Sequence, residues 1–321
     1  MSEQRAISVP AEDAGERLDK FLARHCPELS RRAAMGIIER GLVRVGGKRA
    51  VKALRLAAGD VVSLPADVGL APPAQPELAL DVRLERGDLV VVEKPAGQPS
   101  APLAPGERGT LAGALAARYP EMLGVGYRAR EPGLIHRLDT RTSGLVVAAR
   151  SAVAFEALVE ALRAHHIDKR YLAIVEAAGL PEQALIELPL MSEPGGSGRV
   201  VVAPVSGAPS GARACRSRLR TLERRGRFAL VEVEASRAYR HQVRVHLAAS
   251  GWPIAGDLEY GGAARDALAG RHALHASHVA WAGDASVPAF AVDSPLPADL
   301  LAFFTGASAR AGGDASSANS S

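Results

Sequence analysis

Residues 65–77 divide the chain into two parts with different sequence patterns. This stretch is rich in proline, alanine and glycine and has no periodicity, which is typical of a semi-stiff linker. The chain has 321 residues, of which 47% are hydrophobic, so each part can bury a core. We therefore predict a small domain over residues 16–64 and a large domain over residues 78–305, with a flexible N-terminus (1–15) and a disordered tail (306–321).

The small domain has the pattern of two helices and two strands. Apolar residues recur at helical spacing over residues 18–22, and again in a segment that begins with Ser30 as N-cap and ends at Gly41. Residues 42–45 then form a strand pattern that runs into a hairpin turn, and residues 61–64 form another. The segment is therefore predicted to be a compact α/β domain.

Positive charge is concentrated in this small domain. Residues 17–55 contain eleven Lys and Arg against three acidic residues, a local balance of +8 in a chain of net charge +4. The rest of the chain must then sum to about −4. A basic module joined to a nearly neutral body is typical of a contact with a phosphate backbone, although any one of these residues could belong to a solvated helix face.

Several short motifs of this domain resemble the alpha-L RNA-binding domain, first known from a small-subunit ribosomal protein. They are Arg17-Leu18-Asp19-Lys20-Phe21-Leu22, Leu29-Ser30-Arg31-Arg32, Gly41-Leu42-Val43-Arg44-Val45 and Gly59-Asp60. The resemblance implies binding of structured RNA. The residues it points to as RNA contacts are Arg17, Lys20, Arg31, Arg32, Arg44 and Lys48.

The large domain has short apolar runs separated by turn signals. Such runs predict strands, here over residues 89–92, 145–147, 171–175 and 229–233. One helix interrupts them, with Ser151 as its N-cap, and residues 192–211 have the composition of a loop. Strands that predominate over scattered helices favour an α+β fold rather than a regular array of βαβ units.

A cluster of polar residues between two apolar flanks covers residues 133–147. Asp139 lies at its centre, next to threonine and serine residues. An aspartate in this setting can simply form an Asx turn or cap a backbone N–H group. Composition alone therefore does not assign it a chemical role.

The full string is more specific, because it resembles the catalytic loop of the RluA-type pseudouridine synthases. That family has His-Arg-Leu-Asp, two variable residues and Thr-Ser-Gly, and residues 136–144 match every fixed position. Further blocks of the same family match in order over residues 88–97, 168–175, 241–257 and 273–276. The implied fold is a mixed, mainly antiparallel sheet of the pseudouridine synthase type.

The resemblance implies a role for each matching residue. Asp139 would be the essential carboxylate, either attacking C1′ of the ribose or removing the C2′ proton. Arg244 would pair with Asp139, and Tyr171 would stack on the uracil. These roles are physically sensible, because a guanidinium keeps a carboxylate ionised and an aromatic ring binds a base of any sequence. The residues expected to bind the substrate RNA in this domain are His136, Arg137, Thr142, Lys169, His241 and Gln242.

The chain departs from the family pattern at Glu93, where the family usually has Asn, and in the segment before His241. The family usually has Gly-Arg-Thr before the histidine of its later block, whereas this chain has Ala238-Tyr239-Arg240 before His241. Loss of the glycine implies different turn chemistry, and the bulky pair could reshape the rim of the pocket. This change leaves Arg244 in place.

Other classes of chemistry lack their motifs. His272, His275 and His278 are spaced for one helical face, but their surroundings suit a strand and no carboxylate or cysteine completes a metal site. There is no phosphate-binding loop or dinucleotide fingerprint, and a glycosidase would need a second catalytic carboxylate that the sequence does not identify. We therefore expect an enzyme without metal or cofactor.

The remaining expectations concern partners and location. The two cysteines fit no disulfide framework, and no apolar stretch is long enough for a signal peptide or a membrane span, which favours the cytoplasm. The resemblance implies a monomer that modifies RNA, with large-subunit ribosomal RNA favoured over transfer RNA. The alternative is a non-catalytic RNA-binding or ribosome-assembly protein of the same fold.

Overall fold

The computed structural model describes residues 4–26, 29, 31–39, 41–66, 71–104, 106–195, 198–204, 211–235, 238–263 and 266–311. The chain forms two compact units. The first comprises residues 1–90, 98–137 and 147–158, and the second comprises residues 91–97, 138–146 and 159–321. Ser30, the expected N-cap, lies outside the described residues, and so does the side chain of Arg32.

The first unit begins with a four-stranded sheet of order β1-β4-β2-β3. Its strands are β1 (Gln4–Ser8), β2 (Arg44–Val45), β3 (Lys48–Arg49) and β4 (Val61–Pro65). Because β1 pairs with β4 along its whole length, the expectation of a flexible N-terminus is wrong for these residues. The predicted hairpin is confirmed: Gly46 and Gly47 both have positive φ, as a tight two-residue turn between strands requires.

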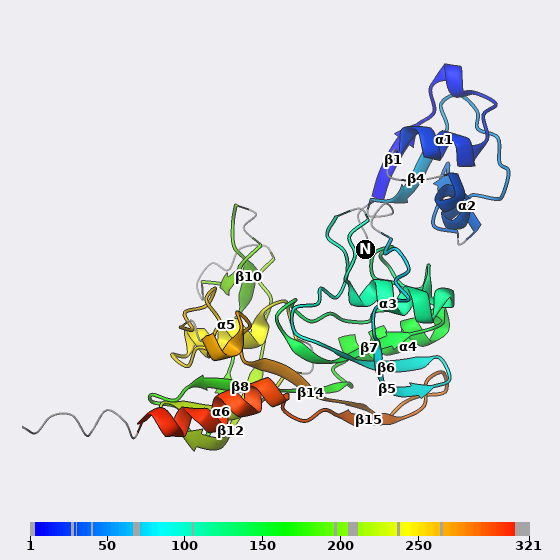
Figure 1. Ribbon diagram of the computed structural model, residues 1–321. Coiled ribbons are helices and arrows are strands. Elements are labelled where there is room, and N and C mark those ends of the chain that lie inside the picture. Colours follow the sequence, from blue (N-terminus) through cyan, green and yellow to red (C-terminus); the bar gives the residue numbers. More distant parts are fainter. Residues whose placement is uncertain are drawn as a thin grey trace, which may run out of the picture. The chain divides into compact units, whose positions relative to one another are not determined.

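Two helices pack with this sheet, as the sequence predicts. They are α1 (Leu18–His25) and α2 (Arg31–Glu39), both amphipathic. Phe21 of α1, Ile37 of α2 and Leu64 of β4 are buried in one hydrophobic core. Figure 1 shows this domain in blue, with α1 and α2 beside β1 and β4.

The rest of the first unit contains β5 (Asp81–Arg86), the start of β6 (Leu89–Lys94), helix α3 (Leu111–Arg118) and the start of helix α4 (Ala152–Arg163). Part of the predicted linker packs here instead of spacing two domains. Gln75 is buried, its N–H donates to the carbonyl of Gly113 (3.0 Å), and its Oε1 accepts from the N–H of Gly109 (2.9 Å). The backbone N–H of Gln75 thus binds α3, and its side-chain amide binds the segment just before α3; proline-rich composition predicts neither contact.

The second unit contains strands in the order β7-β14-β8-β13-β12-β9, with β15 also paired to β14. Their bounds are β7 (Ser143–Ala149), β8 (Asp168–Glu176), β9 (Gln183–Ile186), β12 (Ser217–Arg225), β13 (Phe228–Glu234), β14 (Leu274–Trp281) and β15 (Phe290–Asp293). Only β7 and β14 pair in parallel among these described strands. The predicted mixed, mainly antiparallel α+β fold is confirmed.

Four further elements differ from the expectations. Strands β10 (Leu190–Ser192) and β11 (Val200–Val202) pair antiparallel, so Ser192 and all of β11 are strand within the predicted loop over residues 192–211. Helix α5 (Gln242–Ala249) was not predicted. Helix α6 (Ala298–Ala311) includes residues 306–311 of the expected disordered tail; residues 312–321 lie outside the described residues.

Helix α6 exists because its apolar face is buried on the sheet. Leu300 and Phe304 are at most 1% exposed, and the Phe303 ring lies 5.1 Å from that of Phe228 in β13. Figure 1 shows α6 in red beside β12. None of the helices in the described part of the chain is both long and apolar enough to cross a membrane.

Candidate active site

The loop that carries Asp139 is fixed by a lysine buried beneath it. Lys94 Nζ donates to the carbonyl oxygens of Pro95 (2.9 Å) and Thr140 (3.2 Å), and the N–H of Gly97 also donates to the Thr140 carbonyl (2.7 Å). The N–H of Thr142 closes a turn on the carbonyl of Asp139 (3.0 Å). The backbone from Asp139 to Thr142 is therefore held in one conformation.

The Thr-Ser-Gly part of the motif anchors the loop to strand β14. Thr142 Oγ1 lies 2.7 Å from His272 Nε2, and Ser143 Oγ lies 2.9 Å from His275 Nδ1. Gly144 has a φ of +122°, and a Cβ atom there would collide with the backbone of Ala276. Thr142 was expected to bind substrate, but it is 2% exposed and is engaged by His272.

The guanidinium of Arg244 is surrounded by three carboxylates. Its Nη1 donates to Asp139 Oδ2 (2.9 Å). Its Nε and Nη2 donate to the two carboxylate oxygens of Asp257 (2.7 and 2.8 Å), and Nη2 also reaches Glu259 Oε2 (2.7 Å). The guanidinium carbon lies 4.8 Å from the ring centroid of Tyr260. The bidentate bond to Asp257 and the ring beneath fix the position from which Arg244 meets Asp139.

The pKa shifts follow from this crowding of charges. Burial opposes the charged form of Arg244, but the carboxylates of Asp257 and Asp139 outweigh it and raise the pKa of the guanidinium. Burial likewise opposes ionisation of Asp257, but Arg244 outweighs it and lowers the pKa of that carboxyl group. Burial, with a further contribution from Arg244, lowers the pKa of His272 to about 4. The Arg244–Asp257 pair is therefore charged at neutral pH, and the His272 ring is neutral.

A cavity of about 240 Å³ opens over this cluster. The residues that line it are Asp139, Thr140, Arg141, His241, Arg244, Gly256, Asp257, Leu258, Glu259 and His272. Within the described residues there is no group of His, Cys, Asp and Glu side chains that could hold a metal ion. The ionisable groups that line this cavity are three carboxylates, two arginines and two histidines.

Tyr171 lies in strand β8 and is 5% exposed. It does not contribute to the lining of the cavity, yet burial and the charge of Asp139 together raise the pKa of its hydroxyl group. Lys169, two residues earlier on the same side of the strand, is also 5% exposed, and burial lowers its pKa to about 8. Asp139, Arg244 and Tyr171 thus occupy the same part of the second unit.

His241 and Gln242, both expected to bind substrate, have different positions. His241 begins helix α5 in the left-handed conformation, its Nε2 lies 3.7 Å from Asp139 Oδ1, and its Nδ1 lies 2.8 Å from the hydroxyl of Tyr260. Gln242 is 2% exposed, and its amide group accepts from the N–H of Tyr239 and donates to Arg216 and Ser217. His241 therefore reaches the cavity, whereas Gln242 serves the protein's own hydrogen bonding.

His136 and Arg137 belong to the first unit. His136 Nε2 accepts from the N–H of Val147 (3.1 Å), which requires the proton to be on Nδ1 in the neutral ring. Arg137 is exposed and lies 3.0 Å from Glu131, whose carboxylate also meets Arg130 (3.3 Å) and Arg128 (3.7 Å). Three guanidinium groups share one carboxylate, so this loop keeps a net positive charge.

The residues of the N-terminal domain that were expected to contact RNA fall into two groups. Arg17 and Arg31 each donate to a carboxylate oxygen of the buried Asp19 at 2.8 Å, which fixes both guanidinium groups. The second group is exposed and has no acidic partner in the described part of the chain; it consists of Lys20, Arg44 and Lys48. The side chain of Arg32 lies outside the described residues.

Four residues of the site were missed by the sequence analysis: Lys94, Asp257, Glu259 and His272. Lys94 and Asp257 lie in the matched motif blocks, but a lysine before proline and an aspartate after glycine look like surface and turn residues. Their burial, 0% for Lys94 and 2% for Asp257, is a tertiary property. Only the order Gly256-Asp257, placed close after Arg244, could have signalled a partner for the arginine.

Comparison with known proteins points to two families. Residues 88–249 match the model described as RNA pseudouridylate synthase, and residues 16–62 match the S4 domain. An uncharacterized RNA pseudouridine synthase of Chloroflexus aurantiacus is 38% identical over 93% of this chain and 92% of its own length. Ribosomal large subunit pseudouridine synthase D of Neisseria meningitidis serogroup B is 30% identical over 98% of this chain and 84% of its own.

Solved structures agree on the fold. Human RNA pseudouridylate synthase domain containing 4 has a TM-score of 0.54 and 22% identity, covering 72% of this chain and 92% of that one. Human RNA pseudouridylate synthase domain containing 1 has a TM-score of 0.53 and 23% identity, covering 70% of this chain and 85% of that one. The architecture of the described units therefore has counterparts in solved proteins.

Proposed function

The chain belongs to the RNA pseudouridylate synthase family and is an isomerase acting on RNA, and on this premise we propose that it converts specific uridines of large-subunit ribosomal RNA to pseudouridine through the carboxylate of Asp139. The observation that carries the proposal is the ion pair of 2.9 Å between Asp139 and the buried Arg244 at the wall of a cavity. Such a pair requires an ionised carboxylate, which is the form needed by a nucleophile or a base.

The reaction balances without any added atom. The bond between C1′ and N1 breaks, a bond between C1′ and C5 forms, the hydrogen on C5 is lost as a proton and N1 gains a proton. Asp139 either attacks C1′ or removes the C2′ proton, and both roles need the same ionised oxygen. Asp257 holds Arg244 in place through two bonds. Arg244 can therefore stabilise the charge on the Asp139 oxygen without changing its own position.

The uridine must leave its helix to reach this carboxylate, which costs a few kcal/mol of unstacking. The cavity, at about 240 Å³, is smaller than the roughly 300–1,000 Å³ of pockets for drug-sized ligands, and its size suits a single base. In this proposal the uracil passes beyond the present lining of the cavity and stacks on Tyr171, whose ring is buried near Asp139 and whose raised pKa keeps the hydroxyl neutral. Arg137 and its neighbouring arginines hold the flanking RNA.

The choice of ribosomal RNA is supported by the relative of 30% identity, which is named for the ribosomal large subunit. It is also supported by the S4 domain, whose exposed Lys20, Arg44 and Lys48 can contact RNA phosphates. In the proposal, residues 16–64 form the RNA-binding domain and residues 78–305 the catalytic domain. The protein acts as a monomer in the cytoplasm, and transfer RNA is the alternative substrate.

The test is to map pseudouridine in total RNA from cells with and without this protein. We expect one or a few uridines of large-subunit ribosomal RNA to lose the modification and to regain it when the wild-type gene is restored. Loss of pseudouridine only in transfer RNA would show that transfer RNA is the substrate. An unchanged map would leave a non-catalytic RNA-binding protein and would refute the proposal.

A further inference from the structure

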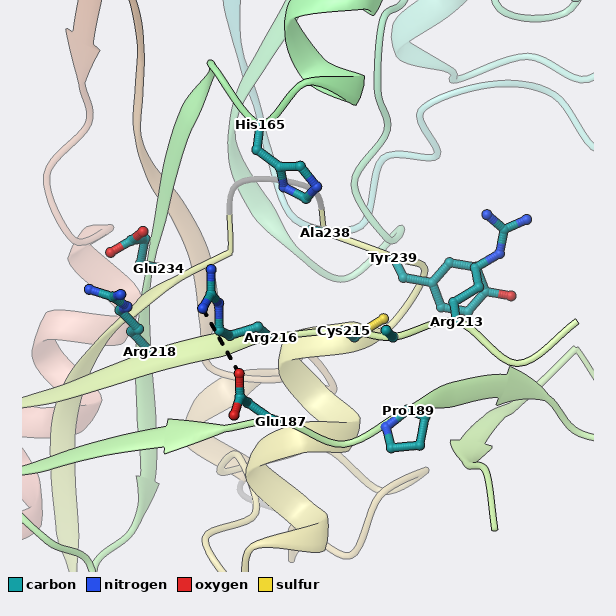
Figure 2. Close-up of a pocket in the computed structure, with 11 residues that line it drawn as sticks. His165, Glu187, Pro189, Arg213, Cys215, Arg216, Arg218, Glu234, Ala238 and Tyr239 are labelled. Atoms are coloured by element: carbon teal, nitrogen blue, oxygen red, sulfur yellow. Dashed lines mark ion pairs between the residues drawn. The ribbon is translucent and has the colours of Figure 1, made fainter. Parts of the chain in front are cut away.

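The second unit contains a larger hollow, of about 1,070 Å³, that the proposed chemistry does not use. Figure 2 shows Arg213, Arg216 and Arg218 along one side of it, with Cys215 between them and Tyr239 beside Arg213. We call it the arginine pocket. No residue of its lining also lines the cavity at Asp139. Its volume exceeds that needed for a single base.

Each of the three arginines of this pocket is exposed, but they differ in their acidic neighbours. Arg216 lies 3.9 Å from Glu187, a long contact between two side chains that are each 61% exposed. Arg218 lies opposite Glu234 in the register of β12 and β13. Arg213 has no acidic partner in the described part of the chain. Since exposed pairs contribute little, these guanidinium groups remain available to an external anion.

The Arg213 side chain is paired with an aromatic ring. Its guanidinium carbon lies 5.3 Å from the ring centroid of Tyr239, and its backbone N–H and C=O both bond to Leu190 (2.8 and 2.9 Å). The Tyr239 ring packs against a buried apolar cluster that includes Val245 of helix α5. Both members of the pair are thus anchored to ordered structure. Guanidinium planes and aromatic rings are the two side-chain surfaces on which unpaired bases stack.

The arginine pocket is linked to the catalytic arginine by one buried side chain. Gln242 accepts from the N–H of Tyr239 (2.9 Å) and donates to the carbonyl of Arg216 (2.9 Å). The same residue begins helix α5, which carries Arg244 two residues later. A ligand that contacts Tyr239 and Arg216 would therefore affect, through Gln242, the position of the helix that carries Arg244.

We propose that the arginine pocket binds a second unpaired nucleotide of the substrate RNA, with its base stacked on the Arg213–Tyr239 pair and its phosphates at Arg216 and Arg218. This inference rests on the proposed function for the identity of the ligand as RNA. It assigns a role to Tyr239, which stands where the family usually has arginine, so the pocket would select the RNA context of the uridine. An acidic peptide could use the same charges, but it would gain nothing from the stacking surface.

Cys215 allows a direct test without mutation. The chain has two cysteines, neither in a disulfide; Cys26 is fully buried, whereas Cys215 is half-buried and lines the arginine pocket. Iodoacetamide should therefore alkylate Cys215 selectively, as measured by mass spectrometry. An unmodified transcript of large-subunit ribosomal RNA, at a concentration that saturates binding, should slow this reaction on the order of tenfold.

The outcomes of this test separate the alternatives. An unchanged alkylation rate in the RNA-bound protein would overturn the proposal. Protection by polyglutamate at equal charge concentration, without protection by RNA, would overturn it in favour of an acidic partner. If pseudouridine mapping shows activity but Cys215 stays unprotected, the pocket assignment fails and the proposed function stands.

Variants give an independent test of the stacking pair. Arg213→Ala and Tyr239→Ala should each weaken RNA binding on the order of tenfold. Tyr239→Phe keeps the ring and should bind like wild type. The matched control is Arg220→Ala, which removes another exposed arginine, in β12 and outside the pocket. Equal losses of affinity in Arg213→Ala and Arg220→Ala would show a general charge effect and overturn the proposal.

Discussion

The Nη1 atom of Arg244 lies 2.9 Å from Oδ2 of Asp139, and this is one of three carboxylate contacts that the same guanidinium makes. Asp257 accepts from two nitrogens of Arg244 in a bidentate bond, and Glu259, the third carboxylate, accepts from Nη2. The orientation of Arg244 therefore does not depend on Asp139. When the Asp139 oxygen turns toward a ribose, the arginine can stay in place and continue to favour the charged form.

Asp139→Asn should abolish conversion of uridine while RNA binding stays within about twofold of wild type. The amide has the shape of the carboxylate but cannot act as a nucleophile or base, so we expect a loss of at least roughly 10³-fold in rate. The measurement is release of tritium from RNA labelled at C5 of uridine, since that hydrogen leaves as the new bond forms. Rates close to wild type in this variant would exclude Asp139 as the reactive group.

Asp257→Ala should lower both stability and the rate at saturating RNA. Asp257 is 2% exposed, and removing one partner of a buried pair costs about 3 kcal/mol or more of unfolding free energy. Glu259→Ala is the matched control, because Glu259 binds the same arginine but its side chain is 38% exposed; we expect at most about 1 kcal/mol. Urea unfolding and single-turnover rates would test both. Equal effects of the two substitutions would argue against Asp257 as the residue that positions Arg244.

Local sequence predicted those parts of the fold in which the pattern of apolar residues matches the burial of the element. The strands around Val91, Val146, Ile174 and Val231 are short apolar runs in buried sheets, and the structure confirms them. The motif around Asp139 was recognised because its residues are contiguous. The structure pairs Asp139 with Arg244, 105 residues away, as the family resemblance implied.

Helix α5 shows why other parts were missed. Its sequence alternates Val243, Arg244, Val245 and His246, a period of two that is typical of a strand, yet all four residues are buried in a helix. The polar members are buried because Asp257 and Glu259 neutralise Arg244 and because Ser217 binds His246. These partners lie 13 to 29 residues away, so no local pattern could reveal the helix.

Tyr171→Phe should retain activity, whereas Tyr171→Ala should lose most of it. Burial and the charge of Asp139 raise the pKa of the Tyr171 hydroxyl, so this group remains protonated through the neutral and mildly alkaline range. The ring is then the part that binds, at about 1–3 kcal/mol for a stacked base. Steady-state rates from pH 6 to 9 would test this. A Tyr171→Phe variant as inactive as Tyr171→Ala would assign the function to the hydroxyl instead.

Lys94 should make stability depend on pH. Burial lowers its pKa from 10.5 to about 7, although Asp139 acts in the opposite direction. Between these values the unfolded chain binds more protons than the folded protein, so the free energy of unfolding rises with pH by up to about 5 kcal/mol from this group. Below pH 7 Lys94 is charged in the folded protein too, so the full cost of burying its ammonium group lowers the free energy of unfolding.

Lys94→Met removes this titration and also the bond to Thr140. The stability of the variant relative to wild type should therefore be greater at pH 6 than at pH 9, as measured by urea unfolding at both. Its rate of conversion should fall at either pH, because the loop that carries Asp139 loses an anchor. If the stability difference between variant and wild type does not change with pH, the pKa of Lys94 is not lowered in the folded protein.

Replacing Lys20, Arg44 and Lys48 together by alanine should weaken RNA binding and reduce its dependence on salt. All three are exposed and lack acidic partners in the described part of the chain, so each can release a counterion from a phosphate. The slope of log affinity against log salt should fall by about 2 to 3. The control replaces Arg163, Arg220 and Arg227, which are also exposed but lie near Glu160, Glu232 and Glu176. Both triple variants lose the same charge, so equal slopes would exclude a specific contact of the N-terminal domain with RNA.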